Sequence, residues 1–275
     1  MATKRAPAPG EADKLIAHQA RLLKAPRIAA HYSRLAEQGR AAGWSLEDYL
    51  AAVLAVESNA RAESGARQRI RYAGFPAIKT ITDFDFTAQP HVDRAQIARL
   101  EAGGWLAEAR NIVLLGPPGT GKTHLATALA IAAAQAGHRV AFAPATGWIT
   151  RLAEAHRIGR LDAELRKISR IGLIVIDEVG YIPFDTEAAN LFFQLVSTRY
   201  EKSSIILTSN LPFSKAHLFA RTCAEVASKR DTFALIWVRR AGRAVGPRRG
   251  DRRGRSSLPR VSSRTLPLRV SGRSY

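Results

Sequence analysis

The stretch that decides the fold reads Gly-Pro-Pro-Gly-Thr-Gly-Lys-Thr and occupies residues Gly116–Thr123. It fits the pattern G-x-x-x-x-G-K-S/T completely, between an apolar strand candidate, Asn111–Leu115, and a helical stretch that begins near Lys122. Glycines let backbone N–H groups approach phosphate oxygens closely, and the N-terminus of the following helix adds a favourable dipole. The pattern therefore predicts an ATP-binding loop made of Gly116, Pro117, Pro118, Gly119, Thr120, Gly121, Lys122 and Thr123.

Two side chains of this loop have separate predicted roles. The Lys122 ammonium is expected to reach the β- and γ-phosphates, and the Thr123 hydroxyl is expected to ligate Mg²⁺. A chance glycine-rich turn is the alternative interpretation. The complete motif in its strand–loop–helix context favours the phosphate-binding role.

A second motif supplies two carboxylates. The apolar run Leu173–Ile176 is followed directly by Asp177 and Glu178, which places both acids at the carboxyl edge of a predicted strand, where α/β sheets bind ligands. We expect Asp177 to hold Mg²⁺, directly or through water, and Glu178 to polarise the attacking water beside the γ-phosphate. A plain strand terminus is the alternative, and the phosphate loop roughly 55 residues upstream argues against it.

Three further residues are weaker candidates. Asn210 ends the apolar run that begins at Ser204, so it is expected either to orient water or the γ-phosphate, or only to open a turn before Pro212. Arg199 is expected either to reach the nucleotide of a neighbouring subunit or, more commonly, to interact with the dipole of its own helix. His124 is interpreted as a packing or capping residue.

The chain divides into four regions by composition. Residues 11–74 are predicted to form a helical module, residues 75–90 a linker, residues 91–214 the ATPase core, and residues 215–275 an Arg-rich tail that is disordered. In the core, short and nearly unbroken apolar strands alternate with helical stretches near 122–136, 146–168 and 186–200, which predicts an α/β fold with a parallel sheet covered by helices on both faces. The strand candidates are Asn111–Leu115, Val140–Phe142, Leu173–Ile176 and Ser204–Leu207.

The helical module shows a helix start and a helical periodicity. Ser45 with Asp48 resembles a capping box, and Leu46, Tyr49, Leu50, Val53 and Leu54 follow with amphipathic spacing. Pro26 is expected to break or begin an earlier helix that carries Ile28, Tyr32 and Leu35 on one face. The arginines near the end of the module are candidate DNA contacts, with a solvated helix face as the alternative: Arg67, Arg69 and Arg71.

Composition excludes several classes of protein. The 275 residues are 46% hydrophobic and 24% charged, which excludes wholesale disorder, and the single cysteine, Cys223, excludes a disulfide framework. No signal peptide is visible and no apolar stretch is long enough to span a bilayer, so a cytoplasmic location without membrane contact is expected. The net charge of +19 is concentrated at the end of the chain, where residues 211–275 hold 16 Lys and Arg against 3 Asp and Glu.

Taken together, these passages resemble the IstB-like ATPases, which are AAA+ helper proteins of bacterial insertion sequences related to the DnaC helicase loader. The resemblance runs from about residue 12 to 214, and it is most specific where the phosphate loop, the two acids and the polar end of the last strand occur together. The passages that carry it are Gly43-Trp44-Ser45, Phe75–Thr80, Asp83–Phe86, Gly116–Ala126, Leu173–Pro183, Arg199–Glu201 and Ile206–Ser214.

The resemblance implies more than the residues themselves do. It implies an AAA+ core behind a small helical domain, and an ATP-dependent homo-oligomer that binds DNA and helps a cognate transposase to choose its target. A DnaC-like helicase loader shares this core and is one alternative function. A subunit that binds ATP and DNA but does not hydrolyse ATP is another.

The chain departs from the family after Ser214. Lys215–Arg230 lacks the family's arginine-containing segment, and every basic residue within 231–275 is Arg. A frame-shifted or decayed element explains this composition better than a genuine basic arm. We therefore expect ATP binding with weak or absent DNA-stimulated hydrolysis, because hydrolysis in AAA+ assemblies commonly needs an arginine from the neighbouring subunit.

Overall fold

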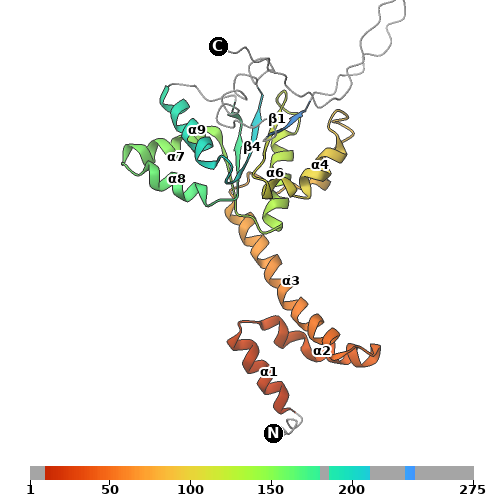
Figure 1. The fold of residues 1–275 in the computed structure, drawn as a ribbon. Helices are drawn as coiled ribbons and strands as arrows, with labels where there is room; N and C mark the ends of the chain where they lie inside the picture. Colours follow the sequence, from red (N-terminus) through yellow and green to blue (C-terminus); the bar gives the residue numbers. More distant parts are fainter. Residues whose placement is uncertain (1–9, 180–185, 211–232, 239–275) are drawn as a thin grey trace, which may run out of the picture. The chain divides into compact units, whose positions relative to one another are not determined.

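The computed structural model describes residues 10–179, 186–210 and 233–238. Three helices come first along the chain, and alternating strands and helices follow (Figure 1). The elements are α1 (Glu11–Leu22), α2 (Pro26–Ala42), α3 (Leu46–Tyr72), the 3-10 helix η1 (Ile81–Asp83), α4 (Arg94–Glu101), α5 (Gly104–Ala107), β1 (Asn111–Leu115), α6 (Lys122–Gln135), β2 (Val140–Pro144), α7 (Ala145–Arg157), α8 (Leu161–Ser169), β3 (Leu173–Asp177), α9 (Thr186–Arg199), β4 (Ser204–Ser209) and β5 (Phe233–Trp237).

The strands form one parallel sheet in the order β2-β3-β4-β1-β5. The register pairs Val113 of β1 with Leu207 of β4 on one side and with Leu235 of β5 on the other. Every residue of β1, β3 and β4 is buried. Strands buried on both faces are typical of parallel sheets sandwiched between helices, so the predicted α/β architecture is confirmed.

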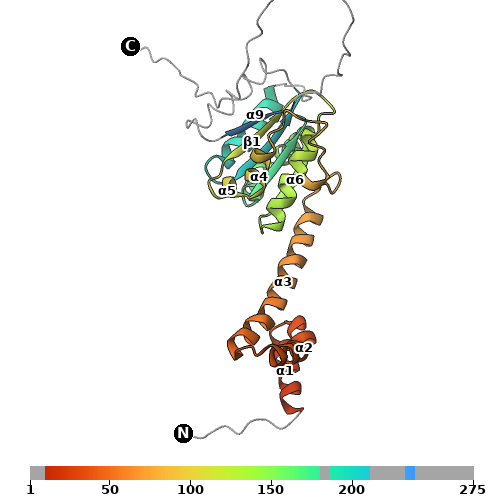
Figure 2. The ribbon, with the colours of Figure 1, turned by 90° about the vertical axis from the view of Figure 1, so that its right-hand side faces the viewer.

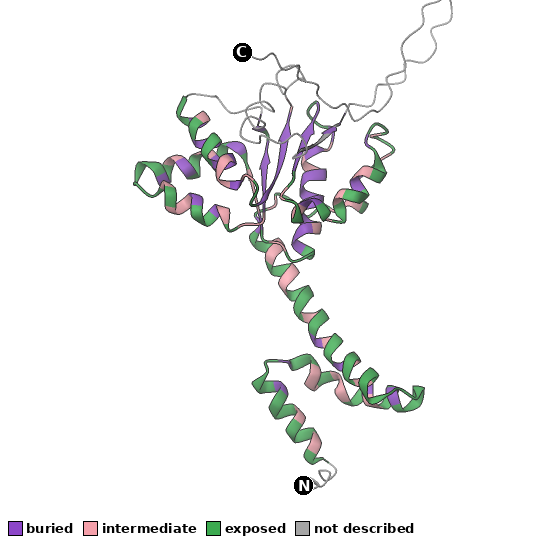
Figure 3. Ribbon diagram, in the orientation of Figure 1, coloured by how far each residue is buried: buried purple, intermediate pink, exposed green. Residues whose placement is uncertain are grey.

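Each face of the sheet has its own hydrophobic cluster, because successive side chains along a strand point to opposite faces. Val113 and Ile174 pack with the helices α7, α8 and α9, whereas Ile112 and Val175 pack with α6 and α4. Figures 1 and 2 show these two groups of helices on the two sides of the sheet, and Figure 3 shows the strands between them as buried. The two packed layers fix the sheet from both faces. The polar motif residues lie at the carboxyl edge of this fixed sheet.

Two predicted boundaries differ from the structure. The stretch 146–168 is two helices rather than one, because α7 ends at Arg157 and Gly159 adopts a left-handed backbone with φ +67°. The interpretation of residues 215–275 as a disordered tail is wrong for 233–237, since these residues form β5 and pair with β1 along its whole length. Without β5, β1 would be the edge strand of the sheet. Apart from residue 238, the rest of that tail lies outside the described residues.

The N-terminal helical module forms as predicted. Pro26 is the first residue of α2, a position where its missing N–H costs no helical hydrogen bond. The Ser45 hydroxyl oxygen accepts a hydrogen bond from the Asp48 N–H, and the Asp48 carboxylate accepts one from the Ser45 N–H, so the capping box is confirmed at the start of α3.

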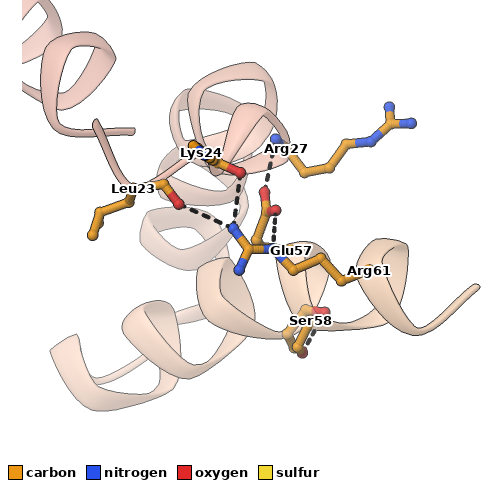
Figure 4. Close-up of polar contacts among 7 residues, drawn as sticks. Leu23, Lys24, Arg27, Glu57, Ser58 and Arg61 are labelled. Carbon is orange, nitrogen blue, oxygen red and sulfur yellow. Dashed lines mark hydrogen bonds and ion pairs between the residues drawn. The ribbon is translucent and has the colours of Figure 1, made fainter. Parts of the chain in front are cut away.

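A turn between α1 and α2 is tied to α3 by one arginine and one glutamate (Figure 4). The Arg61 guanidinium donates to the carbonyl oxygens of Leu23 and Lys24 and to the Glu57 carboxylate. The Glu57 carboxylate also accepts a hydrogen bond from the Arg27 N–H. Burial by itself raises the pKa of Glu57, but these donors outweigh it and lower the pKa, so the carboxylate stays charged.

The apolar stripe of α3 stays largely open to solvent. Val53 is buried, but Leu46 is 82% exposed and Leu50 is 56% exposed. Among the described residues, most of the exposed large hydrophobic side chains belong to this module: Leu15, Leu22, Leu23, Trp44, Leu46, Leu50, Leu54 and Tyr72. No helix among the described residues is long and apolar enough to cross a membrane.

Residues 73–90, which include the predicted linker 75–90, lie between α3 and α4 and pack against the sheet domain. The Phe142 N–H of β2 donates to the Ala73 carbonyl oxygen, and the Phe75 ring lies edge-on to the Phe142 ring. Phe84 is buried in the cluster that contains α6. This segment is therefore part of the domain's core as well as a connection.

Candidate nucleotide-binding site

The predicted ATP-binding residues form a single loop that leads from β1 into the first turn of α6. Gly116, Gly119 and Gly121 have φ values of +152°, +75° and +88°, which residues with a side chain rarely adopt. A Cβ atom at Gly119 would meet no atom within 4 Å, so the loop has open space beside it there. Consecutive backbone N–H groups around such a space form a cradle that fits phosphate oxygens.

Lys122 is folded back over this loop. Its side chain is buried, and its ammonium donates to the Pro117 carbonyl oxygen at 2.7 Å. The Thr120 hydroxyl donates to the same oxygen at 2.8 Å. Burial lowers the pKa of the Lys122 ammonium, while the negative charges of Asp177 and Glu178 act in the opposite direction. An anion bound in the loop would therefore meet a cation that is already positioned and poorly solvated.

Thr123 and Asp177 come together from α6 and β3. The Thr123 hydroxyl oxygen lies 3.0 Å from both carboxylate oxygens of Asp177, which is buried. A carboxylate and a hydroxyl beside a phosphate loop are the oxygen donors that Mg²⁺ accepts together with phosphate oxygens and water. The residues present therefore fit Mg²⁺.

Thr208 is a part of the site that sequence reasoning missed. Its hydroxyl donates to the Asp177 carboxylate and accepts a hydrogen bond from the Glu178 N–H at 2.9 Å. A threonine at the polar end of an otherwise apolar strand was the available signal. The contact between the ends of β3 and β4 depends on strand order, which the sequence does not state.

Glu178 stands at the exposed edge of the site. It follows the last residue of β3, it is exposed, and its φ of +59° is uncommon for a residue that is not glycine. Backbone strain of this kind costs on the order of 1–3 kcal/mol and persists only where surrounding contacts hold it. Here the Thr208 hydroxyl holds the Glu178 N–H.

Asn210 lies directly beyond β4, next to the start of the phosphate loop. The Ser209 carbonyl oxygen accepts a hydrogen bond from the Gly116 N–H at 3.2 Å, so the backbone leading into Asn210 touches the loop. The Asn210 side chain is half-buried. The strand order thus brings this residue to the same edge as Asp177 and Glu178.

His124 packs against the segment that precedes the sheet. Its Nε2 lies 2.9 Å from the Thr80 carbonyl oxygen, and its ring lies edge-on to Phe84 with centroids 5.3 Å apart. A Cβ atom at Gly121 would lie 2.7 Å from the Phe84 ring. The packing role predicted for His124 is confirmed, and Phe84 requires a glycine at position 121.

Arg199 has neither of the roles considered from sequence. It is 1% exposed, so it does not reach towards a neighbouring subunit. Its guanidinium donates to the carbonyl oxygens of Ile168, Ile171 and Ser204, which belong to the end of α8, the turn after it, and the start of β4. It therefore caps a different helix from its own. Burial lowers its pKa to about 10, which leaves it charged at neutral pH.

The three candidate DNA contacts differ in their surroundings. Arg69 is half-buried, and its Nε donates to the Ala134 carbonyl oxygen of α6 at 2.7 Å, so this side chain joins α3 to the sheet domain. Arg67 is exposed and forms a loose ion pair with Glu63 at 3.7 Å. Arg71 is exposed and lies over the Tyr72 ring. Cys223 and Lys215–Arg230 lie outside the described residues.

Comparison with known proteins places the chain in a family. The family described as IstB-like ATP binding protein matches residues 18–224, which extends beyond Ser214, where the sequence reading placed the departure from the family. The insertion sequence IS21 putative ATP-binding protein of Pseudomonas aeruginosa is 41% identical over 70% of this chain and 72% of its own length. A putative insertion sequence ATP-binding protein of Sinorhizobium fredii is 36% identical over 70% of this chain and 65% of its own length.

Solved structures with a related fold include the DnaC helicase loader, with a TM-score of 0.45, 25% identity, and coverage of 52% of this chain and 86% of that chain. AMPPCP-bound DnaA from Aquifex aeolicus has a TM-score of 0.49 and 21% identity, with coverage of 60% of this chain and 51% of that chain. The parallel sheet of this chain carries its phosphate loop directly after β1, and a helical region precedes the sheet in the sequence. The chain belongs to the family of IstB-like ATP-binding proteins of insertion sequences.

Proposed function

We propose that this chain binds Mg-ATP in the loop after β1 and uses it in an assembly that acts on DNA. The observation that supports this most strongly is the convergence of three side chains at the carboxyl edge of the sheet. Thr123 of α6 contacts Asp177 of β3 there, and the Lys122 ammonium lies over the same loop on the Pro117 carbonyl, near the negative charge of Asp177 and beside the open space next to Gly119.

Each residue has a defined part in the proposed site. The loop and Lys122 bind the phosphates, exchanging the ammonium's contact with the Pro117 carbonyl for contacts with phosphate oxygens. Thr123 and Asp177 would hold Mg²⁺, which supplies charge neutralisation for the β- and γ-phosphates. Glu178 accepts a proton from the attacking water, and Asn210 orients that water or the γ-phosphate.

Turnover is the experiment that tests hydrolysis. We propose measuring phosphate release by the full chain with and without double-stranded DNA, alongside fluorescent-nucleotide titration. Saturable Mg-ATP binding with DNA-stimulated turnover supports an active ATPase. Binding without turnover supports an ATP-dependent DNA-binding subunit. Absence of Mg-ATP binding would overturn the proposal.

We further propose that the DNA is bound without strong sequence preference and that the chain works as a homo-oligomer with a transposase of the same insertion sequence. Two observations support this. The chain carries 42 Lys and Arg against 23 Asp and Glu, which favours contact with phosphates. The helical module leaves a group of leucines exposed, which favours association with a protein.

A transposase of the same insertion sequence is the partner to test. The full chain should co-purify with it in the presence of Mg-ATP, and replacing Leu46 and Leu50 with Ser should weaken that association without changing ATP binding. Those two side chains are 82% and 56% exposed, so their loss removes little from the fold. If the double variant associates as strongly as the parent, the surface that binds the partner does not include Leu46 and Leu50.

A further inference from the structure

The phosphate loop has a support that the loop sequence does not reveal, and it comes from the segment beyond the family match. Residue 238 follows β5 and lies beside the first residue of the loop. The Val238 N–H donates to the Leu115 carbonyl oxygen at 2.7 Å, so the parallel pairing of β5 with β1 continues to the last residue before Gly116.

The Val238 carbonyl group fills the space next to Gly116. A Cβ atom on Gly116 would lie 1.9 Å from the Val238 carbonyl oxygen and 2.9 Å from its carbonyl carbon. No side chain fits there, and backbone cannot swing aside as the end of a long side chain can. On its other side, Gly116 donates its N–H to the Ser209 carbonyl oxygen of β4. The first glycine of the loop is thus held between the ends of two strands.

The segment that supplies this contact is anchored in the core. Ile236 is 3% exposed and Val238 is fully buried, and both belong to the cluster that contains Leu125 and Ala126 of α6. The same cluster therefore packs β5 against the helix that follows the phosphate loop. A shift of residue 238 would move one wall of the loop.

From this geometry we propose that Val238 is a positioning residue for ATP, which acts through Gly116 by fixing the backbone of the phosphate loop. This rests on the proposed ATP site. If Val238 has this role, the C-terminal region contributes a working part of the site. This part lies beyond residue 224, where the family match ends. The contact is made by backbone atoms, so it depends on the N–H and on the position of residue 238 rather than on the valine side chain.

Full-length variants at two positions test this. Val238→Pro removes the N–H that binds Leu115 and is expected to weaken Mg-ATP binding about tenfold or more, whereas Val238→Ala keeps that N–H and should stay within about threefold of the parent. Ile236→Val is the matched control, because it loosens the same buried strand without touching the loop. It should lower the unfolding temperature and leave Mg-ATP affinity unchanged.

The outcomes separate this inference from the proposed function. If the parent chain binds no Mg-ATP, the proposed function has failed. If the parent binds and Val238→Pro binds equally well, or if Val238→Ala loses as much as Val238→Pro, the positioning role is overturned.

Hydrogen exchange on the parent chain provides a measurement that does not depend on any variant folding. The Val238 amide should exchange as slowly as the amides of Ile112–Leu115, since it is bonded in the same ladder. Exchange at the rate of an unstructured peptide would also overturn the inference.

Discussion

Thr123 and Asp177 lie 54 positions apart in the sequence, yet the Thr123 hydroxyl oxygen is 3.0 Å from both carboxylate oxygens of Asp177. The contact joins the first turn of α6 to the end of β3 and defines where a divalent cation would be held. Thr208 donates to the same carboxylate from β4. Three elements therefore position the buried aspartate of the site, and this arrangement leads to the first prediction.

Replacing Asp177 with Asn should weaken nucleotide binding only when Mg²⁺ is present. The amide keeps the shape of the side chain but removes the charge that a divalent cation needs. We expect a loss of about tenfold or more in Mg-ATP affinity by fluorescent-nucleotide titration, and little change in EDTA. An equal loss in EDTA would mean that Asp177 acts through the fold, and circular dichroism of the variant would then show it.

Lys122→Ala should weaken Mg-ATP binding at least tenfold, or about 1.4 kcal/mol, because the phosphates lose their main side-chain cation while the backbone loop remains. Lys202→Ala is the matched control, since Lys202 is exposed and precedes β4 at the opposite edge of the sheet. Unchanged affinity of the Lys122 variant would refute this site.

The same lysine predicts a pH dependence. Burial lowers the pKa of the Lys122 ammonium below the 10.5 of an ordinary lysine, and binding requires the charged form. Mg-ATP affinity should therefore be complete below that lowered pKa and fall as the pH rises through it. Lys122→Arg keeps a positive charge throughout this range, so its affinity should show no such fall in titrations at increasing pH.

Glu178→Gln should affect turnover and leave binding nearly unchanged. The amide cannot accept a proton from water, and losing such a base typically costs about 10²–10⁴ in rate. Provided that the parent hydrolyses ATP, single-turnover measurements should find the variant trapped with ATP bound. Turnover at the parental rate would show that Glu178 has another role.

DNA binding should fall steeply with salt concentration, because neutralised phosphates release their counterions. Arg67→Ala and Arg71→Ala remove exposed charges, and each should lower the slope of log affinity against log salt by about 1 if that side chain contacts a phosphate. Arg69→Ala differs, because Arg69 already donates to Ala134, so it should lower the unfolding temperature as well. Affinity that survives high salt would contradict the electrostatic account.

Arg199→Met should lower the stability of the domain, and this loss should be measurable in the absence of nucleotide. The substitution removes the guanidinium that donates to the carbonyl oxygens of Ile168, Ile171 and Ser204, of which the Ile168 oxygen keeps a second donor, the Ile171 N–H. Each buried acceptor left unpaired costs about 1–3 kcal/mol, so we expect a loss of roughly 2 kcal/mol or more in denaturant unfolding. Arg199→Lys should recover part of it. Normal stability with impaired hydrolysis would instead support a role in the assembly.

The sequence by itself determined the class of fold and the chemistry of the site. The motif Gly116–Thr123 and the acids after Leu173–Ile176 needed only local order, because a strand, a loop and a helix in succession place them at the same edge of a parallel sheet. Local signals also sufficed for the Ser45 capping box and for Pro26 at the start of α2, since both depend on residues within one turn of a helix.

Only the tertiary structure decided which residues meet across the sheet. Thr208 joins Asp177 because β4 lies beside β3, and Val238 meets Gly116 because β5 lies beside β1. Arg199 turns inward to carbonyls near the end of α8, although its position at a helix end is equally compatible with exposure. Contacts of this kind form because strand order and packing bring distant residues together. The periodicity of hydrophobic residues along the sequence does not specify that strand order.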